Sequence, residues 1–209
     1  MSTTFDVFPS IMAIPTFDEV LDLSHIYLKD ALTKHNITKD FQIDVRIQKN
    51  EGDTITPFLK SSPAKWNDDE YAWFFITGQG GGCDAYYGEI PEEPSEGNSI
   101  TIEDWCEQIL SCKKAQNFEH AIRQCINNAI YWCFRRSAGQ PPIVNLSYGL
   151  IAAAFAKLTD GFIYSLDSAW EYSLFPSRAD EFVQYYFDPN QDNSYGRWAK
   201  DCLDYLRDM

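Results

Sequence analysis

The segment from Phe41 to Gln48 alternates strictly between apolar and polar residues, and this pattern constrains the fold more than any other. The side chains of a β-strand point alternately to its two faces, so Phe41, Ile43, Val45 and Ile47 share one face. A strand with one apolar face belongs to a sheet that buries this face against other elements. We therefore expect a sheet with one buried face in this part of the chain.

Three further strands are expected beside it. Turn residues at 51–53 predict a reversal into a strand at 54–59, and Pro57 places this strand at a sheet edge. The aromatic segment 71–77 is typical of a strand, and 86–90 can pair with it across the intervening glycines. The sequence therefore predicts an antiparallel meander of about four strands.

Helical spacing dominates before and after these strands. Thr16 and Glu19 have the spacing of a capping box, which begins a helix that ends near Asn36. Beyond a loop at 91–98, helices are predicted at 102–110, 117–138, 147–157, 177–186 and 195–207, with a short strand at 161–165. The prediction is one α+β domain over residues 1–209: an N-terminal helix, the four-stranded sheet, and a helical C-terminal half packed on it. A subdomain boundary near residue 95 stays open.

Acidic residues are concentrated in one part of the chain. The net charge is −14, and the stretch 66–112 holds eleven acids and no Lys or Arg. The rest of the chain has 20 acids and 17 bases. The negative electrostatic field of such a stretch repels nucleic acid and anionic membranes and attracts basic proteins. The alternative interpretation is that the acidity only keeps the protein in solution.

Tyr and Trp residues lie among these acids, as they do in protein–protein interfaces. The residues expected to contact a basic partner are Asp68, Asp69, Glu70, Trp73, Asp84, Tyr86, Tyr87, Glu89, Glu92, Glu93 and Glu96. They would cover the cationic groove of an effector, for example a nuclease. Strand alternation predicts that about half of the aromatic residues face the core instead.

Several sequence features bear on location and cofactors. Residues 1–15 contain no Lys or Arg, and the apolar run 149–156 is too short to span a membrane. A cytoplasmic protein is therefore expected, with all six cysteines as free thiols. Their spacings match no zinc motif, and the three histidines are scattered, so no metal or cofactor is predicted.

Catalysis is the second hypothesis. The glycines at 78–82 follow a strand, but no Lys or helix start follows them, so a turn is favoured over a phosphate site. Cys83 with His120 would make a thiol hydrolase, and Asp167 with Glu171 would suit glycoside chemistry. The acids around Cys83 disfavour its thiolate form. A third hypothesis is an acidic structural or regulatory subunit.

One segment resembles a known class of proteins. The run LTDGFIYSLDSAW at 158–170, with Phe175-Pro176 and the residues at 180–182, is similar to a segment of bacterial immunity proteins encoded beside polymorphic toxins. The residues form a helix end, a glycine turn, a short strand and a capped helix, which is a structural module and not a reactive site. The resemblance implies a cytoplasmic inhibitor that docks on a toxin.

Overall fold

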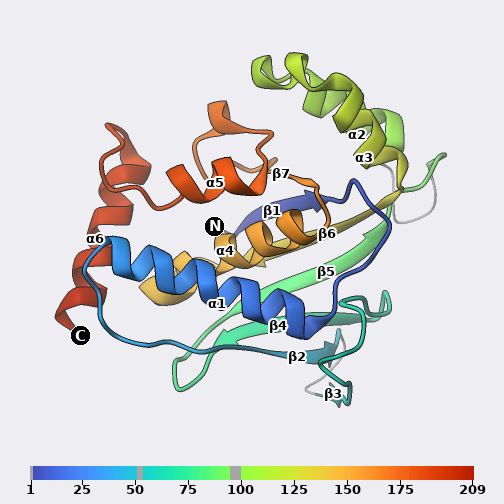
Figure 1. Cartoon of the computed structure of the whole chain (residues 1–209). Coiled ribbons are helices and arrows are strands. Elements are labelled where there is room, and N and C mark those ends of the chain that lie inside the picture. The colour runs from blue at the N-terminus through green and yellow to red at the C-terminus, as the bar shows by residue number, and fades with distance from the viewer. Residues whose placement is uncertain (1, 51–53, 95–99) are drawn as a thin grey trace.

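The protein is described by a computed structural model that covers residues 2–50, 54–94 and 100–209. In these ranges seven strands form one antiparallel sheet in the order β3-β2-β4-β5-β6-β1-β7 (Figure 1). The strands are β1 (Thr3–Phe8), β2 (Ile43–Lys49), β3 (Ile55–Thr56), β4 (Glu70–Ile76), β5 (Cys83–Glu89), β6 (Ile130–Arg136) and β7 (Phe162–Tyr164). The α+β class is as predicted, but the sheet has more strands than the expected four.

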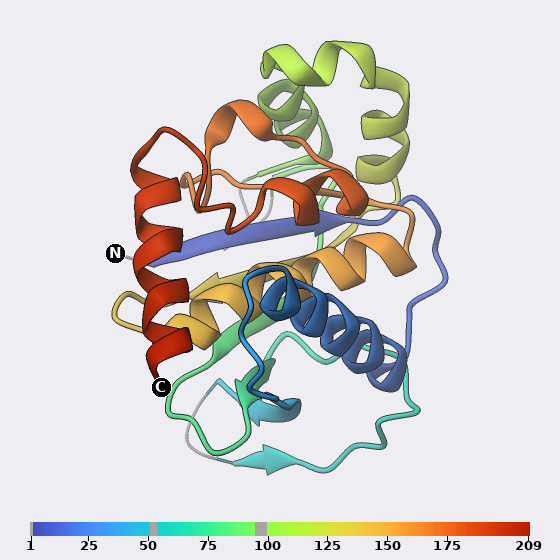
Figure 2. The ribbon, with the colours of Figure 1, turned by 60° about the vertical axis from the view of Figure 1, so that its left-hand side comes forward.

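The helices are α1 (Phe17–Lys34), α2 (Ile102–Leu110), α3 (Glu119–Asn127), α4 (Pro142–Leu158), α5 (Ala179–Tyr185) and α6 (Ser194–Asp208), with 3₁₀ turns η1 (Lys113–Asn117) and η2 (Tyr172–Leu174). Helices α1, α4 and α5 lie beside one another over one face of the sheet (Figures 1 and 2). Every residue of α4 from Ile143 to Ala156 is buried, because the helix lies between the sheet and its helical neighbours. Among the described residues, no helix has the length and apolarity to cross a membrane.

The expected order of the first elements is wrong, because a strand precedes the first helix. β1 lies between β6 and β7, where Phe5 and Val7 are fully buried. α1 follows and begins with the predicted capping box: the Glu19 N–H donates to Thr16 Oγ1 at 3.2 Å, and the Thr16 N–H donates to Glu19 Oε2 at 2.8 Å. The sequence therefore determined this helix start, whereas β1 depends on partners more than 120 residues away.

The predicted helix at 117–138 is also wrong in its second half. α3 ends at Asn127, and Ala129 adopts a left-handed conformation with φ 56°. The chain then extends into β6, where Ile130, Trp132 and Phe134 are buried on alternate positions. β6 pairs with both β5 and β1, so segments on both sides of residue 95 share one sheet. The three strands beyond the expected meander are β1, β6 and β7, and β7 corresponds to the short strand expected at 161–165.

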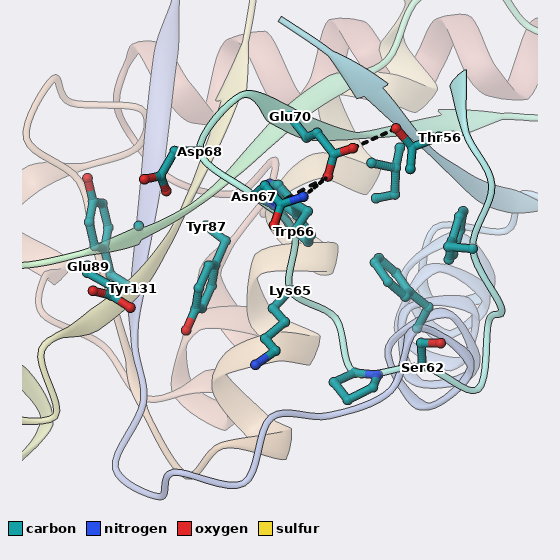
Figure 3. Close-up of a pocket in the computed structure, with 15 residues that line it drawn as sticks. Thr56, Ser62, Lys65, Trp66, Asn67, Asp68, Glu70, Tyr87, Glu89 and Tyr131 are labelled. Atoms are coloured by element: carbon teal, nitrogen blue, oxygen red, sulfur yellow. Dashed lines mark hydrogen bonds between the residues drawn. The ribbon is translucent and has the colours of Figure 1, made fainter. Parts of the chain in front are cut away.

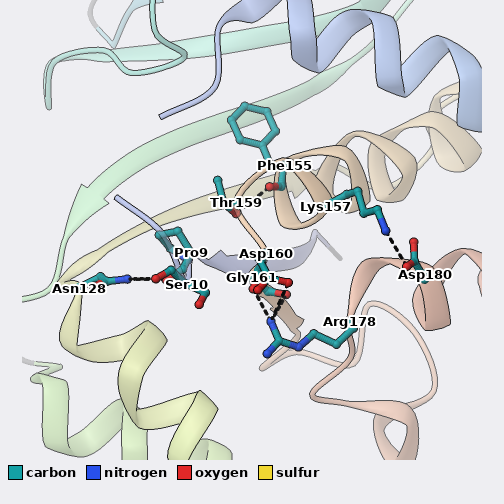
Figure 4. A network of polar contacts seen from close by, with 10 residues as sticks. All are labelled: Pro9, Ser10, Asn128, Phe155, Lys157, Thr159, Asp160, Gly161, Arg178 and Asp180. Atoms are coloured by element: carbon teal, nitrogen blue, oxygen red, sulfur yellow. Dashed lines mark hydrogen bonds and ion pairs between the residues drawn. The ribbon is translucent and has the colours of Figure 1, made fainter. Parts of the chain in front are cut away.

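The corner after α4 is held by polar contacts to the main chain (Figure 4). Arg178 Nη1 donates to the carbonyl oxygens of Asp160 and Gly161, the latter at 3.0 Å. Lys157 forms an ion pair with Asp180 at 2.6 Å. These contacts join the end of α4 to the start of α5, so the segment from 157 to 180 forms a structural corner.

Candidate functional site

A cleft of about 730 Å³ opens beside the start of α1, where the connection between β3 and β4 meets the end of β5 (Figure 3). It combines carboxylates with aromatic rings and one Lys. The wall residues that bear on function are Lys65, Trp66, Asp68, Glu70, Tyr87 and Glu89. Four of these belong to the predicted partner surface, so the structure brings Asp68, Glu70, Tyr87 and Glu89 to one site.

Glu70 anchors the wall of this cleft. It is only 6% exposed, and its carboxylate accepts hydrogen bonds from Thr56 Oγ1 at 2.6 Å and from Asn67 Nδ2 at 3.1 Å (Figure 3). The Asn67 N–H also donates to it at 3.3 Å. A buried carboxylate is tolerated where such donors surround it. Glu70 therefore fixes β3 and the turn before β4 in place, whereas sequence reasoning assigned it to partner contact.

Asp68 and Glu89 supply exposed negative charge from the two segments that border the cleft, which we call its arms. Asp68 lies in the turn before β4, and Glu89 ends β5. Burial, followed by the negative charge of Glu89, raises the pKa of the Tyr87 phenol. Lys65 extends below Trp66 beside Tyr87 in Figure 3 and is the cation among the lining residues. The net field of the cleft is negative.

Aromatic rings form the base of the cleft. The Trp66 ring centroid lies 6.4 Å from that of Tyr87 and 6.0 Å from that of Phe17. The loop that carries Trp66 is tied to the sheet by Trp132, whose indole N–H donates to the carbonyl oxygen of Ala64 at 2.9 Å. Trp66 is not among the residues predicted to contact a partner, although it stands at the first position of the stretch without Lys or Arg.

Three predicted partner residues lie on the other face of the sheet. Trp73 and Asp84 are directly opposite each other in the β4–β5 ladder, and Asp84 is also opposite Arg135. Arg135 Nε contacts Asp84 Oδ2 at 3.2 Å, and the Tyr86 ring lies 6.0 Å from Tyr71. Burial raises the pKa of Asp84, and Arg135 opposes this shift. These residues are therefore separated from the cleft by the thickness of the sheet.

The remaining predicted residues are dispersed. Asp69 forms a surface ion pair with Lys49 at 3.4 Å. Glu92 and Glu93 are exposed in the loop after β5, and Glu96 lies outside the described residues. Some residues of the acidic stretch therefore line the cleft, and the others lie elsewhere on the surface of the protein.

The residues of the hydrolase hypothesis are not assembled into a reactive group. Cys83 is buried in β5, and burial raises the pKa of its thiol. His120 is exposed on α3, in a separate hollow with Glu119 and Arg123. A buried, protonated thiol lacks the thiolate character that nucleophilic catalysis needs. The glycines between β4 and β5 form the turn of this hairpin, with Gly78 and Gly81 at positive φ.

The carboxylate pair near Trp170 has structural partners. Asp167 accepts hydrogen bonds from the N–H of Thr4 at 3.0 Å and from its hydroxyl at 3.1 Å. Glu171 accepts one from the Ser173 hydroxyl at 3.1 Å. Trp170 is fully buried among aromatic rings, so it offers no face to a sugar. In the described ranges, no group of three or more His, Cys, Asp or Glu residues is placed to hold a metal ion.

Comparison of the chain with protein-family models, curated proteins and solved structures found no match. No relative therefore assigns chemistry to the cleft.

Proposed function

We propose that this protein is a non-catalytic binding protein that captures a basic partner in the cleft between Asp68 and Glu89. The observation that carries the proposal is the composition of this cleft: exposed carboxylates on two arms, aromatic rings at the base and one Lys. Aromatic anchors surrounded by charge are typical of interface hot spots. Carboxylates complementary to a cationic surface speed association and make it sensitive to salt.

The biological role that fits this chemistry is inhibition. A protein that fills the cationic groove of a toxin blocks access of the toxin's substrate without any catalysis of its own. The resemblance at residues 158–182 to immunity proteins supports this role, and a cytoplasmic location would accompany it. The acidic stretch at 66–112 supports a basic target such as a nuclease.

The test is capture of basic proteins by the tagged protein at low salt, followed by elution in a salt gradient. The double variant Asp68→Lys/Glu89→Lys is expected to lose the captured partner at low salt. The matched control Asp201→Lys/Asp208→Lys makes the same change of net charge on α6, on exposed positions away from the cleft. We expect the control to retain the partner.

Equal loss in both double variants would mean that net charge alone attracts the partner, and the cleft would be excluded as the binding site. Retention of the partner by both double variants would also exclude the acidic cleft as the binding site. Circular dichroism of each variant establishes that the fold is intact.

A further inference from the structure

The ladder between β4 and β5 ends before the strands do. These strands pair over Ala72–Phe74 and Cys83–Ala85, whereas β5 stays paired with β6 as far as Glu89. An uninterrupted ladder would set Glu70 opposite Tyr87. Instead the Glu70 N–H donates to the carbonyl oxygen of Asn67 at 2.9 Å. The two strands therefore form a fork, and residues from both arms line the cleft.

The backbone of Tyr87 points into this fork. The Ile90 N–H donates to the carbonyl oxygen of Ala129 at 2.8 Å, so the backbone groups of Ile90 face the β6 side. The N–H and C=O of successive residues in an antiparallel strand point alternately to its two sides. Tyr87 is three residues before Ile90, so its N–H and C=O face away from β6. They are directed toward the position that β4 has left.

We propose that an extended segment of the partner enters the fork and pairs with β5 at Tyr87. This inference rests on the proposed function and specifies how the partner is recognised. Main-chain hydrogen bonds to a strand edge provide affinity, and alternate side chains provide specificity. A segment that carries Lys or Arg at alternate positions fits this cleft, because Asp68 and Glu89 line it.

Trp66 supplies a second feature that suits an extended ligand. Its ring lines the cleft and is only 7% exposed, and in the described part of the chain its buried indole Nε1 has no hydrogen-bond partner. A buried indole N–H usually donates to an acceptor. The main-chain carbonyl groups of an inserted segment become acceptors of this kind once the Trp66 ring tilts to expose its Nε1, which the free protein buries.

The probe is a capped pentapeptide of alternating lysine and valine, titrated at low salt into the isotope-labelled protein and followed by NMR. Two further peptides carry N-methyl groups either on both valines or on all three lysines, which block opposite edges of the extended peptide. We expect the unmodified peptide to shift the Tyr87 amide signal and to slow its exchange with solvent. One methylated peptide should bind about tenfold more weakly, and the other should bind unchanged.

Equal affinity of all three peptides, with no protection of the Tyr87 amide, would overturn strand pairing but leave charge-dependent capture in place. Absence of binding by the unmodified peptide would also overturn it. Loss of partner capture by the control Asp201→Lys/Asp208→Lys would instead count against the proposed function. The two hypotheses therefore fail through different observations.

Discussion

Asp6 of β1 lies directly opposite Cys133 of β6, and the Asp6 side chain is almost wholly buried in the sheet. Burial raises the pKa of Asp6 from 3.8 to about 7, and the negative charge of Asp167 acts in the same direction. A hydrogen bond with the Cys133 thiol opposes the shift. Burial, followed by the charge of Asp6, raises the pKa of the Cys133 thiol as well. The carboxyl and the thiol therefore both favour their protonated forms.

The first prediction is that Asp6 makes stability fall as the pH rises. Below about pH 4 the carboxyl is protonated in both the folded and the unfolded chain. Between about pH 4 and pH 7 the unfolded chain releases this proton first, so folding loses up to about 4 kcal/mol. Above pH 7 the loss is complete. Asp6→Asn is expected to remove this dependence, measured by urea unfolding with tryptophan fluorescence at pH 5 and pH 8.

Asp167→Asn is the control for this experiment, because Asp167 is exposed and acts on Asp6 only at a distance. Its pH dependence should stay close to that of the unmodified protein. The assignment to Asp6 is refuted if Asp6→Asn keeps the full difference in stability between the two pH values.

The second prediction concerns the anchor of the cleft wall. Glu70→Ala removes the acceptor of Thr56 and Asn67 and leaves their donors without a partner, so we expect a loss of about 2–3 kcal/mol. Asp69→Ala, next to it in the chain, should cost less than about 1 kcal/mol, because its ion pair with Lys49 is exposed. Chemical denaturation of both variants measures the difference. Equal costs would contradict the anchoring role.

The third prediction compares two glycines of the β4–β5 turn. A Cβ on Gly82 would lie 2.5 Å from the carbonyl oxygen of Phe74 and 2.6 Å from the Trp73 ring, whereas none of these contacts exists at Gly80. Gly82→Ala is expected to destabilise the protein by about 1–3 kcal/mol through steric overlap. Gly80→Ala should change stability by less than about 0.5 kcal/mol. A thermal melt of each variant tests this, and similar melting temperatures would refute it.

The fourth prediction concerns thiol reactivity. All six cysteines are free, and five of them are buried while Cys133 is half-buried. Burial raises the pKa of the thiols of Cys83, Cys125 and Cys133. We expect a disulfide reagent at pH 7.5 to modify the native protein slowly and to modify all six thiols at once in denaturant. Rapid modification of Cys83 in the native protein would revive the hydrolase hypothesis.

Local sequence patterns determined several elements correctly. The Thr16/Glu19 capping box begins α1, and the apolar segment 147–157 forms most of α4. The alternating segment that begins at Phe41 forms β2 from Ile43 onward, with Ile43, Val45 and Ile47 buried. Each of these patterns records an interaction within a few residues or a single buried face. Elements that depend on such local interactions can therefore be predicted from the sequence alone.

The tertiary structure decided which segments pair and where the cleft opens. β1 and β6 are strands because each is paired on both sides within the sheet, although Trp132 and Cys133 also continue the helical spacing of α3. The predicted partner residues are close together in the sequence, but strand alternation divides them, with Trp73 and Asp84 on one face of the sheet and Tyr87 in the cleft. The fork depends on the turn from Asn67 to Glu70, which ends the β4–β5 ladder. β6, which pairs with both β5 and β1 across the sheet, lies far from both in the sequence, so no local pattern specifies its register.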